Sequence, residues 1–181
     1  MAVIVIDPGH GGPDPGACGF GLQEKAIALS VSKLLAADLM KLGHAAPLTR
    51  DRDPVDELDL YPRCTFSNDK WADAFVSIHC NAAESASAKG TETYHFRGST
   101  LGRLLATAIH TELCNTCEIT IDRGVKEAGF YVLGNTDAPA AFVELALISN
   151  GQDAAYLSSH AWQKSAAKAI ATGIQAYLQG G

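Results

Sequence analysis

Cationic side chains are scarce in this sequence. It has 14 Lys and Arg residues against 20 Asp and Glu residues, which gives a formal net charge of -6 over 181 residues. Non-specific nucleic-acid binding depends on cations that neutralise phosphates, so this balance argues against a nucleic-acid partner. It argues equally against a basic protein of the membrane surface.

Long hydrophobic runs are also missing. No stretch of about 18 uninterrupted apolar residues occurs, so the sequence predicts no transmembrane helix and no membrane partner. Met1 leads directly into AVIVID, a run that is too short for a signal peptide and lacks its basic lead. We therefore expect cytoplasmic synthesis without a signal peptide, with a domain excised from a secreted protein as the alternative.

A disulfide framework is the third absence. The five cysteines (18, 64, 80, 114 and 117) are odd in number and irregular in spacing, so free thiols are expected. Cys114 and Cys117 form a CxxC pair, but no matching second pair completes a zinc knuckle. The pair also falls at the predicted C-terminal end of a helix, where the helix dipole opposes a thiolate. Free thiols or a local disulfide are predicted there, and Cys80 is interpreted as a small packing residue.

Strand-like and helical patterns alternate along the chain. Spacings of three and four between apolar residues predict helices over 23–42, 99–114 and 161–178, with a weaker one, interrupted by Pro62, over 55–71. Short apolar runs predict strands at 2–6, 44–49, 74–78, 91–96, 130–133 and 141–147. This alternation is typical of an α/β domain with a largely parallel sheet, and the length fits one domain over residues 1–181.

The stretch VIDPGHGGPDPG, from Val5 to Gly16, runs from the end of the first predicted strand into a loop of glycines, prolines and aspartates. A phosphate cradle would need a third glycine close to a helix, or a Lys-Ser or Lys-Thr pair. Pro13 and Asp14 stand there instead, and aspartates repel phosphate. A tight turn and a metal site remain as interpretations, and the metal site needs further ligands.

Four residues are candidates for such a site, and each could instead have an ordinary structural role. His10 fits a turn, Glu24 fits a first-turn acid that faces the helix dipole, and His79 fits a hydrogen-bonded core histidine. Glu144 could face solvent on an edge strand, but its flanks AAFV and LAL are apolar on both faces, which favours burial. His44, His95, His110 and His160 fit surface or helix-face positions and receive no role.

Taken together, these four residues predict a zinc hydrolase. Two histidines and one carboxylate are a common ligand set for catalytic zinc, with one position left for water. A second carboxylate that is not a ligand would serve as the general base. Spacing leaves open whether Glu24 or Glu144 is the ligand.

Several motifs occur in one order: DPGHGGPDPGACG, then Glu24, TRDRD at 49–53, SIHCNA at 77–82, DRGVK at 122–126 and AAFVELALISN at 140–150. Together they resemble the zinc-dependent N-acetylmuramoyl-L-alanine amidases of the Amidase_3 family, from Val3 to about Tyr177. The sequence departs from the family pattern at Cys80, where a smaller residue is usual, and at Leu145-Ala146-Leu147, which replaces Leu-Gly-Phe.

The resemblance implies a Zn²⁺ ion held by His10, Glu24 and His79, with Glu144 as the catalytic residue. It implies a single α/β domain with a mixed, mostly parallel six-stranded sheet flanked by helices, similar to phosphorylase/hydrolase-like folds. The implied reaction is hydrolysis of the amide bond between N-acetylmuramic acid and L-alanine in peptidoglycan.

Further expectations concern the setting of this reaction. We expect a monomer that acts on the cell wall after release from the cytoplasm, as in phage or mother-cell lysis. A longer parent chain could carry an additional cell-wall-binding domain. The interval from His79 to Glu144 is too short for an inserted inhibitory helix, so we expect an open site. Two alternatives remain: a zinc peptidase that cuts another bond, and a non-catalytic wall-binding module.

Overall fold

A five-stranded sheet forms the centre of the fold, with the strands in the order β1-β4-β7-β5-β6. The computed structural model describes residues 1–56, 59–119 and 121–180. The strands are β1 (Ile4–Pro8), β4 (Ala74–Asn81), β7 (Ala140–Leu147), β5 (Thr91–Phe96) and β6 (Asp122–Ala128). β1, β4 and β7 are mutually parallel, and β5 pairs antiparallel with β7 and parallel with β6. The expected mixed, mostly parallel sheet is confirmed.

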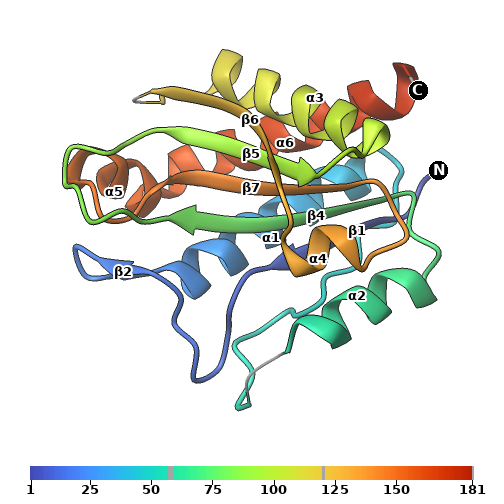
Figure 1. Ribbon diagram of the computed structural model, residues 1–181, viewed down its shortest axis with the longest axis horizontal. Helices are drawn as coiled ribbons and strands as arrows, with labels where there is room; N and C mark the ends of the chain where they lie inside the picture. Colours follow the sequence, from blue (N-terminus) through green and yellow to red (C-terminus); the bar gives the residue numbers. More distant parts are fainter. Residues whose placement is uncertain (57–58, 120, 181) are drawn as a thin grey trace.

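One face of the sheet is covered by long helices. Figure 1 shows α1 (Glu24–Lys41) and α6 (His160–Gly180) behind the strands, with α3 (Thr100–Thr116) packed along α6. Their apolar stripes meet the strand residues that point to this side, and many of these side chains are fully buried, such as Ile6, Val76 and Val143. Each such side chain stabilises the fold by about 1.5–3 kcal/mol. The helices predicted over 23–42, 99–114 and 161–178 are therefore confirmed.

The other face of the sheet is covered only in part. The helix α2 (Leu60–Asp69) and the single turn α4 (Tyr131–Gly134) pack over one end of it. A small second core lies beneath them, formed by Val5, Cys64, Phe75, Val132, Leu133 and Ala140. Since side chains alternate along a strand, the residues next to these in β1, β4 and β7 supply the first core. The uncovered part of this face holds the candidate site.

The sheet has five strands within the described residues, one fewer than expected. The segment predicted as a strand at 44–49 runs beside β1 but forms only isolated bridges, from Val3 to Ala45 and from Ile6 to Leu48. Pro47 has no N–H to donate, which interrupts a continuous ladder. The strand predicted at 130–133 is wrong: these residues begin the helical turn α4.

Other elements escaped the sequence analysis. β6 is mostly polar, with the sequence DRGVKEA, and it lies at the sheet edge, where alternation of apolar residues is not required. The helix α5 (Gly151–Ser158) and the two-residue strands β2 (Cys18–Gly19) and β3 (Leu22–Gln23) are too short for a periodic pattern. Positions 57 and 58 of the helix predicted over 55–71 lie outside the described residues. No helix in the described part of the chain has the length and apolarity needed to cross a membrane.

Candidate metal centre

Two buried arginines hold the loop that carries His10. Arg50 Nη2 donates to the carbonyl of Gly9 at 2.7 Å, and Arg63 Nη2 donates to the carbonyl of His10 at 2.8 Å. Both arginines also donate to the carbonyl of Pro8, at 3.1 and 2.7 Å. His10 has a φ of +58°, a left-handed conformation that disfavours residues with a Cβ. The arginines stabilise this conformation because they fix the carbonyls on both sides of it.

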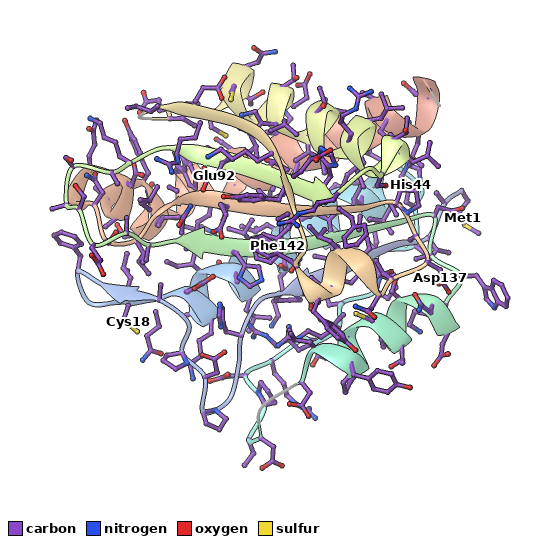
Figure 2. All side chains as sticks on the ribbon, viewed as in Figure 1. Met1, Cys18, His44, Glu92, Asp137 and Phe142 are labelled. Atoms are coloured by element: carbon purple, nitrogen blue, oxygen red, sulfur yellow. The ribbon has the colours of Figure 1, made fainter. Side chains whose placement is uncertain are left out.

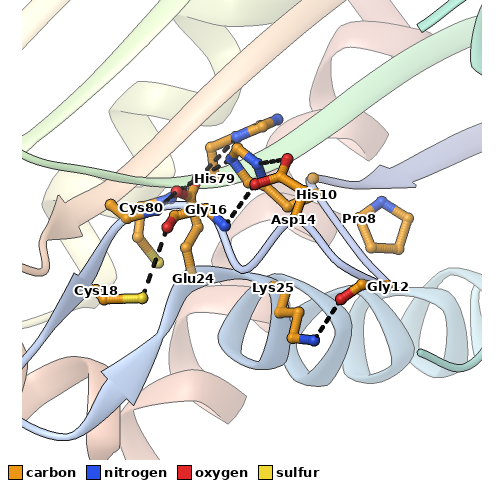
Figure 3. Close-up of polar contacts among 12 residues, drawn as sticks. Pro8, His10, Gly12, Asp14, Gly16, Cys18, Glu24, Lys25, His79 and Cys80 are labelled. Atoms are coloured by element: carbon orange, nitrogen blue, oxygen red, sulfur yellow. Dashed lines mark hydrogen bonds and ion pairs between the residues drawn. The ribbon is translucent and has the colours of Figure 1, made fainter. Parts of the chain in front are cut away.

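Glu24, the first residue of α1, lies between the two candidate histidines. Oε2 of its carboxylate lies 3.1 Å from His10 Nε2, and Oε1 lies 2.8 Å from His79 Nδ1. Figure 3 shows Glu24 together with both histidines. The backbone N–H groups of Ala17 and Cys80 donate to the same two oxygens, at 2.8 and 3.0 Å. Glu24 is only 3% exposed; it lies in the first turn of α1, as the helix-dipole alternative expected, and its carboxylate also contacts both histidines.

Asp14 orients the ring of His10 from the other side. Its Oδ2 lies 2.6 Å from His10 Nδ1, and its Oδ1 accepts a hydrogen bond from the N–H of Gly16 at 2.9 Å. A carboxylate that accepts a hydrogen bond from one ring nitrogen leaves the other nitrogen available as a ligand. Asp14 therefore directs Nε2 of His10 toward Glu24.

His10, Glu24 and His79 thus offer three ligand atoms that all lie within 4.8 Å of one another. Burial lowers the pKa of His10, but the hydrogen bonds and charges of Glu24 and Asp14 outweigh it and raise the pKa to about 9. Burial would raise the pKa of Glu24, yet its bonds to the two histidines hold that pKa well below the ordinary value. The ionised Glu24 is therefore ready to hold a cation, and two histidines with one carboxylate suit zinc.

Glu144 lies beside this cluster because β7 pairs with β4 in register. His79 and Glu144 are direct partners across the two parallel strands, so both side chains project from the same face. Oε2 of Glu144 is buried, and among the described residues it has no hydrogen-bond partner. Burial, with help from the charges of Glu24 and Glu92, raises the pKa of Glu144 to about 8. A buried carboxyl group without a partner is unusual in a folded protein and is typical of functional sites.

Glu92 is a site residue that the sequence analysis missed. It is buried on β5, where Arg123 Nε donates to its Oε2 at 2.9 Å and Tyr94 donates to its Oε1 at 2.8 Å. Lys126 also forms an ion pair with Oε2. Burial alone would raise the pKa of Glu92, but these partners hold it below the ordinary value. Figure 2 labels Glu92 and Phe142 on neighbouring strands. The two cationic partners, Arg123 and Lys126, lie on β6, the strand that the sequence did not reveal.

An aromatic cleft opens in front of the two histidines. It encloses about 550 Å³ and is lined by His10, His79, Phe130, Tyr131 and Phe142 among others. The ring of Phe142 stacks on His79 with 4.0 Å between centroids. This stacking and the hydrogen bond to Glu24 fix the imidazole, while the aromatic walls offer an apolar surface to a substrate.

The described residues between His79 and Glu144 leave this cleft open. They form β5, α3, β6 and α4, and α3 lies on the far face of the sheet. The short turn α4 contributes Tyr131 to the wall of the cleft. The side chain of His10 remains 25% exposed, so the cleft reaches solvent.

The cysteines largely follow the sequence analysis. All five are free, including Cys114 and Cys117. Cys80 is 3% exposed within the large core, which confirms its packing role. His110 lies on a buried face of α3, whereas His95 is buried on β5 and occupies neither a surface nor a helix-face position.

A comparison with known families shows which family this chain belongs to. The sequence profile of the Amidase_3 family, described as N-acetylmuramoyl-L-alanine amidase, matches residues 4–176. The chain belongs to this family.

Relatives of this Amidase_3 chain differ in length. It is 42% identical over 177 residues to the protein YqiI of Bacillus subtilis (strain 168), in a match that covers 96% of this chain and 84% of the relative. It is 38% identical over 179 residues to the N-acetylmuramoyl-L-alanine amidase LytC of the same organism, and that match covers 97% of this chain but 35% of LytC. The Amidase_3 chain thus spans about a third of the longer relative.

A solved structure with the same fold is the N-acetylmuramoyl-L-alanine amidase AmiC2 of Nostoc punctiforme. It superimposes with a TM-score of 0.93 at 37% sequence identity and covers 98% of this chain and 97% of its own. The fold and the enzyme class are therefore those of the amidases, as the motifs predicted.

Proposed function

We propose that this chain hydrolyses the amide bond between N-acetylmuramic acid and L-alanine in peptidoglycan, with Zn²⁺ as its cofactor. The observation that carries this proposal is that a cluster of three possible metal ligands lies beside a buried carboxyl group. A compact His10–Glu24–His79 cluster faces a cleft, and the buried Glu144 beside it has an unpartnered oxygen. Family membership supplies the bond that is cleaved.

His10, Glu24 and His79 would hold the zinc ion. Their fit rests on the donor set, on the orientation that Asp14 gives to the ring of His10, and on the ionised state of Glu24. When bound, zinc lowers the pKa of a coordinated water and polarises the scissile carbonyl. Asp14 keeps the ring of His10 in place throughout.

Glu144 would act as the general base and then as the general acid. Its Oε2 takes the proton from the attacking water and later gives it to the departing amine of L-alanine. A pKa raised by burial makes the same carboxyl group able both to accept and to donate a proton near neutral pH. The aromatic wall formed by Phe130, Tyr131 and Phe142 would position the substrate against this group.

The first experiment is a turbidity assay on purified peptidoglycan, with a chelator and with zinc restored. Hydrolysis that stops with the chelator and returns with zinc supports the proposal. Product analysis then separates the alternatives, because an amidase releases a new N-terminal alanine and a free lactyl carboxylate. A different new N-terminus would indicate a zinc peptidase. Wall binding without hydrolysis by the zinc-loaded protein would indicate a binding module.

We also propose that residues 1–181 form one catalytic domain that acts as a monomer, since all four site residues come from one chain. The match covers only 35% of LytC, so longer relatives have room for a further domain. We propose that this further domain binds the cell wall. Action at the cell wall after release, without need of an activator, fits the open cleft. Activity of the isolated chain at low concentration, measured with its molecular mass in solution, tests these points.

A further inference from the structure

A second group of metal-binding side chains lies away from the candidate centre. His110 and Cys114 stand one turn apart on α3, and Asp122 opens β6. His110 Nε2 lies 2.8 Å from Asp122 Oδ1 and 3.5 Å from Cys114 Sγ. One ligand atom from each of the three residues lies within 4.8 Å of the other two. An imidazole, a thiol and a carboxylate thus converge on one point from two elements.

This cluster is separate from the His10–Glu24–His79 centre because the sheet stands between them. Glu92 and Thr93 are neighbours on β5, and their side chains point to opposite faces. Glu92 pairs with Glu144 on the cleft side. The hydroxyl of Thr93 lies 3.0 Å from His110 Nδ1 on the side that α3 covers. A ligand of the cluster would therefore leave the cleft untouched.

The bond to Thr93 orients His110 as a ligand. A hydroxyl can donate or accept, so it can pair with either tautomer of the imidazole. When Nδ1 carries the proton and donates it to Thr93 Oγ1, the lone pair of Nε2 points toward Cys114 and Asp122. Metal-binding histidines commonly have such a partner on their second nitrogen. The ring is also 5% exposed and cannot turn freely.

We propose that His110, Cys114 and Asp122 form a second metal site, for a divalent cation that accepts sulfur and nitrogen ligands, such as Zn²⁺. On binding, the Cys114 thiol releases its proton to solvent and the thiolate sulfur bonds to the metal, with no change of oxidation state. One thiolate and one carboxylate then balance the charge of the cation. Thiolate and imidazole favour zinc over magnesium or calcium, and a fourth position remains open for water.

The role of this second site is structural: it joins the C-terminal end of α3 to the first residue of β6. The N–H of Gly124 donates to Asp122 Oδ1 at 2.8 Å, so the beginning of β6 is already ordered around this carboxylate. β6 further carries Arg123 and Lys126, which hold Glu92 on the other face. A cation here would stabilise the edge strand without contact with substrate. The inference does not depend on the peptidoglycan chemistry.

Titration of the whole metal-free chain with Co²⁺ tests the proposal. A cobalt ion bound to a thiolate gives a ligand-to-metal charge-transfer band in the near ultraviolet, and the His10–Glu24–His79 centre contains no sulfur. We expect this band in the wild-type chain and its loss in Cys114→Ser. Asp122→Asn should weaken Co²⁺ binding at the band-forming site at least tenfold, and the exposed position of Asp122 makes this variant tolerable for the fold.

Two matched variants control the experiment. Cys18→Ser removes an exposed thiol elsewhere, and Cys117→Ser removes the other cysteine of the CxxC pair; both should keep the band. Equilibrium dialysis should show one zinc equivalent fewer in Cys114→Ser than in wild type, with circular dichroism confirming the fold. The proposal is overturned if saturating Co²⁺ gives no band in the folded wild type, or if the band survives Cys114→Ser. Loss of the band in Cys117→Ser overturns it as well, since the ligands would then be different.

Discussion

Glu144 and Glu92 are direct partners in the antiparallel pairing of β7 with β5, so two carboxyl groups project side by side from one face of the sheet. Their surroundings differ. Glu92 is hydrogen-bonded and paired with Lys126 and Arg123, whereas Oε2 of Glu144 has no partner among the described residues. Glu92 is held ionised and Glu144 is driven toward its neutral form, which separates the pKa values of two chemically identical neighbours.

This relationship predicts an effect of Glu92→Gln on the pH dependence of hydrolysis. Removal of the Glu92 charge lowers the pKa of Glu144, because that charge contributes to raising it. The acid limb of the kcat/KM profile should move to lower pH by about 0.5–1 unit. Glu84→Gln, on an exposed loop, is the control and should leave the limb in place. An unchanged acid limb in Glu92→Gln would count against the coupling.

Glu144→Gln tests the general base itself. The amide keeps the size of the side chain but cannot accept the proton of water, so turnover should fall by about 10²–10⁴-fold. Zinc content should stay at the wild-type level, because Glu144 is not among the three clustered ligands. The readouts are product release and metal analysis of the same preparation. Joint loss of zinc and activity would instead make Glu144 a ligand.

The same variant predicts a pH-dependent gain in stability when metal is absent. The pKa of Glu144 is about 8 in the folded chain against 4.5 for the free side chain, so the folded state binds more protons between these values. Wild-type stability therefore falls as pH rises from about 4.5 to 8, and the loss is complete above pH 8. Glu144→Gln lacks this loss. Its advantage in free energy of unfolding should grow by on the order of 3–5 kcal/mol between pH 4.5 and pH 8.5.

Urea unfolding in the presence of a chelator measures this difference. Comparison of variant with wild type at each pH cancels the titration of the other groups. A constant difference across the pH range would show that Glu144 keeps its ordinary pKa. Addition of zinc should shrink the difference, because a nearby cation favours the charged carboxylate.

Gly9→Ala should damage the metal centre through packing alone. A Cβ at Gly9 would lie 2.3 Å from Cε1 of His79, closer than any real contact, so the imidazole must move. We expect zinc affinity to fall at least tenfold, as for other changes that displace a ligand. Gly129→Ala is the matched control, because its Cβ would meet only Arg97, at 4.0 Å. Equal affinities in the two variants would contradict the predicted displacement.

Asp7→Asn addresses the buried support of the loop. Asp7 is paired with Arg63 at 2.8 Å and accepts hydrogen bonds from Thr49 and Ser77. Since the change removes one charge of a buried, hydrogen-bonded ion pair, it should cost about 3–5 kcal/mol of unfolding free energy. The exposed pair of Asp38 with Lys41 offers the control, and Asp38→Asn should cost less than about 1 kcal/mol. Chemical denaturation of both variants gives the two values.

The candidate site residues were predictable because their types and positions carry chemical meaning. His10 and His79 lie at or near the carboxyl ends of two strands, where a parallel sheet gathers functional groups, and Glu144 interrupts an apolar run. The sequence could not show that the carboxylate of Glu24 contacts both histidines. This contact depends on where the first turn of α1 lies relative to the sheet. The resemblance to the amidases implied Glu24 as the ligand and Glu144 as the catalytic residue, and in the structure Glu24 lies with His10 and His79 in one cluster.

The supporting residues were not predictable from local pattern. Arg50 and Arg52 both occur in the charged segment TRDRD, yet Arg50 is 6% exposed and Arg52 faces solvent. Only the tertiary path of the loop distinguishes them. Glu92 escaped notice for the same reason, because its cationic partners come from β6, an edge strand without apolar alternation.

Two adjacent residues of β5 face opposite sides of the sheet. Glu92 lies beside Glu144 on one side, and Thr93 contacts His110 on the other. A slip of this strand by a single position would exchange the two faces. Insertion of one amino acid just before Glu92 would then abolish both sites together, although it would alter no side chain in either. The antiparallel register of β5 with β7 is thus required by both the catalytic cleft and the second metal site.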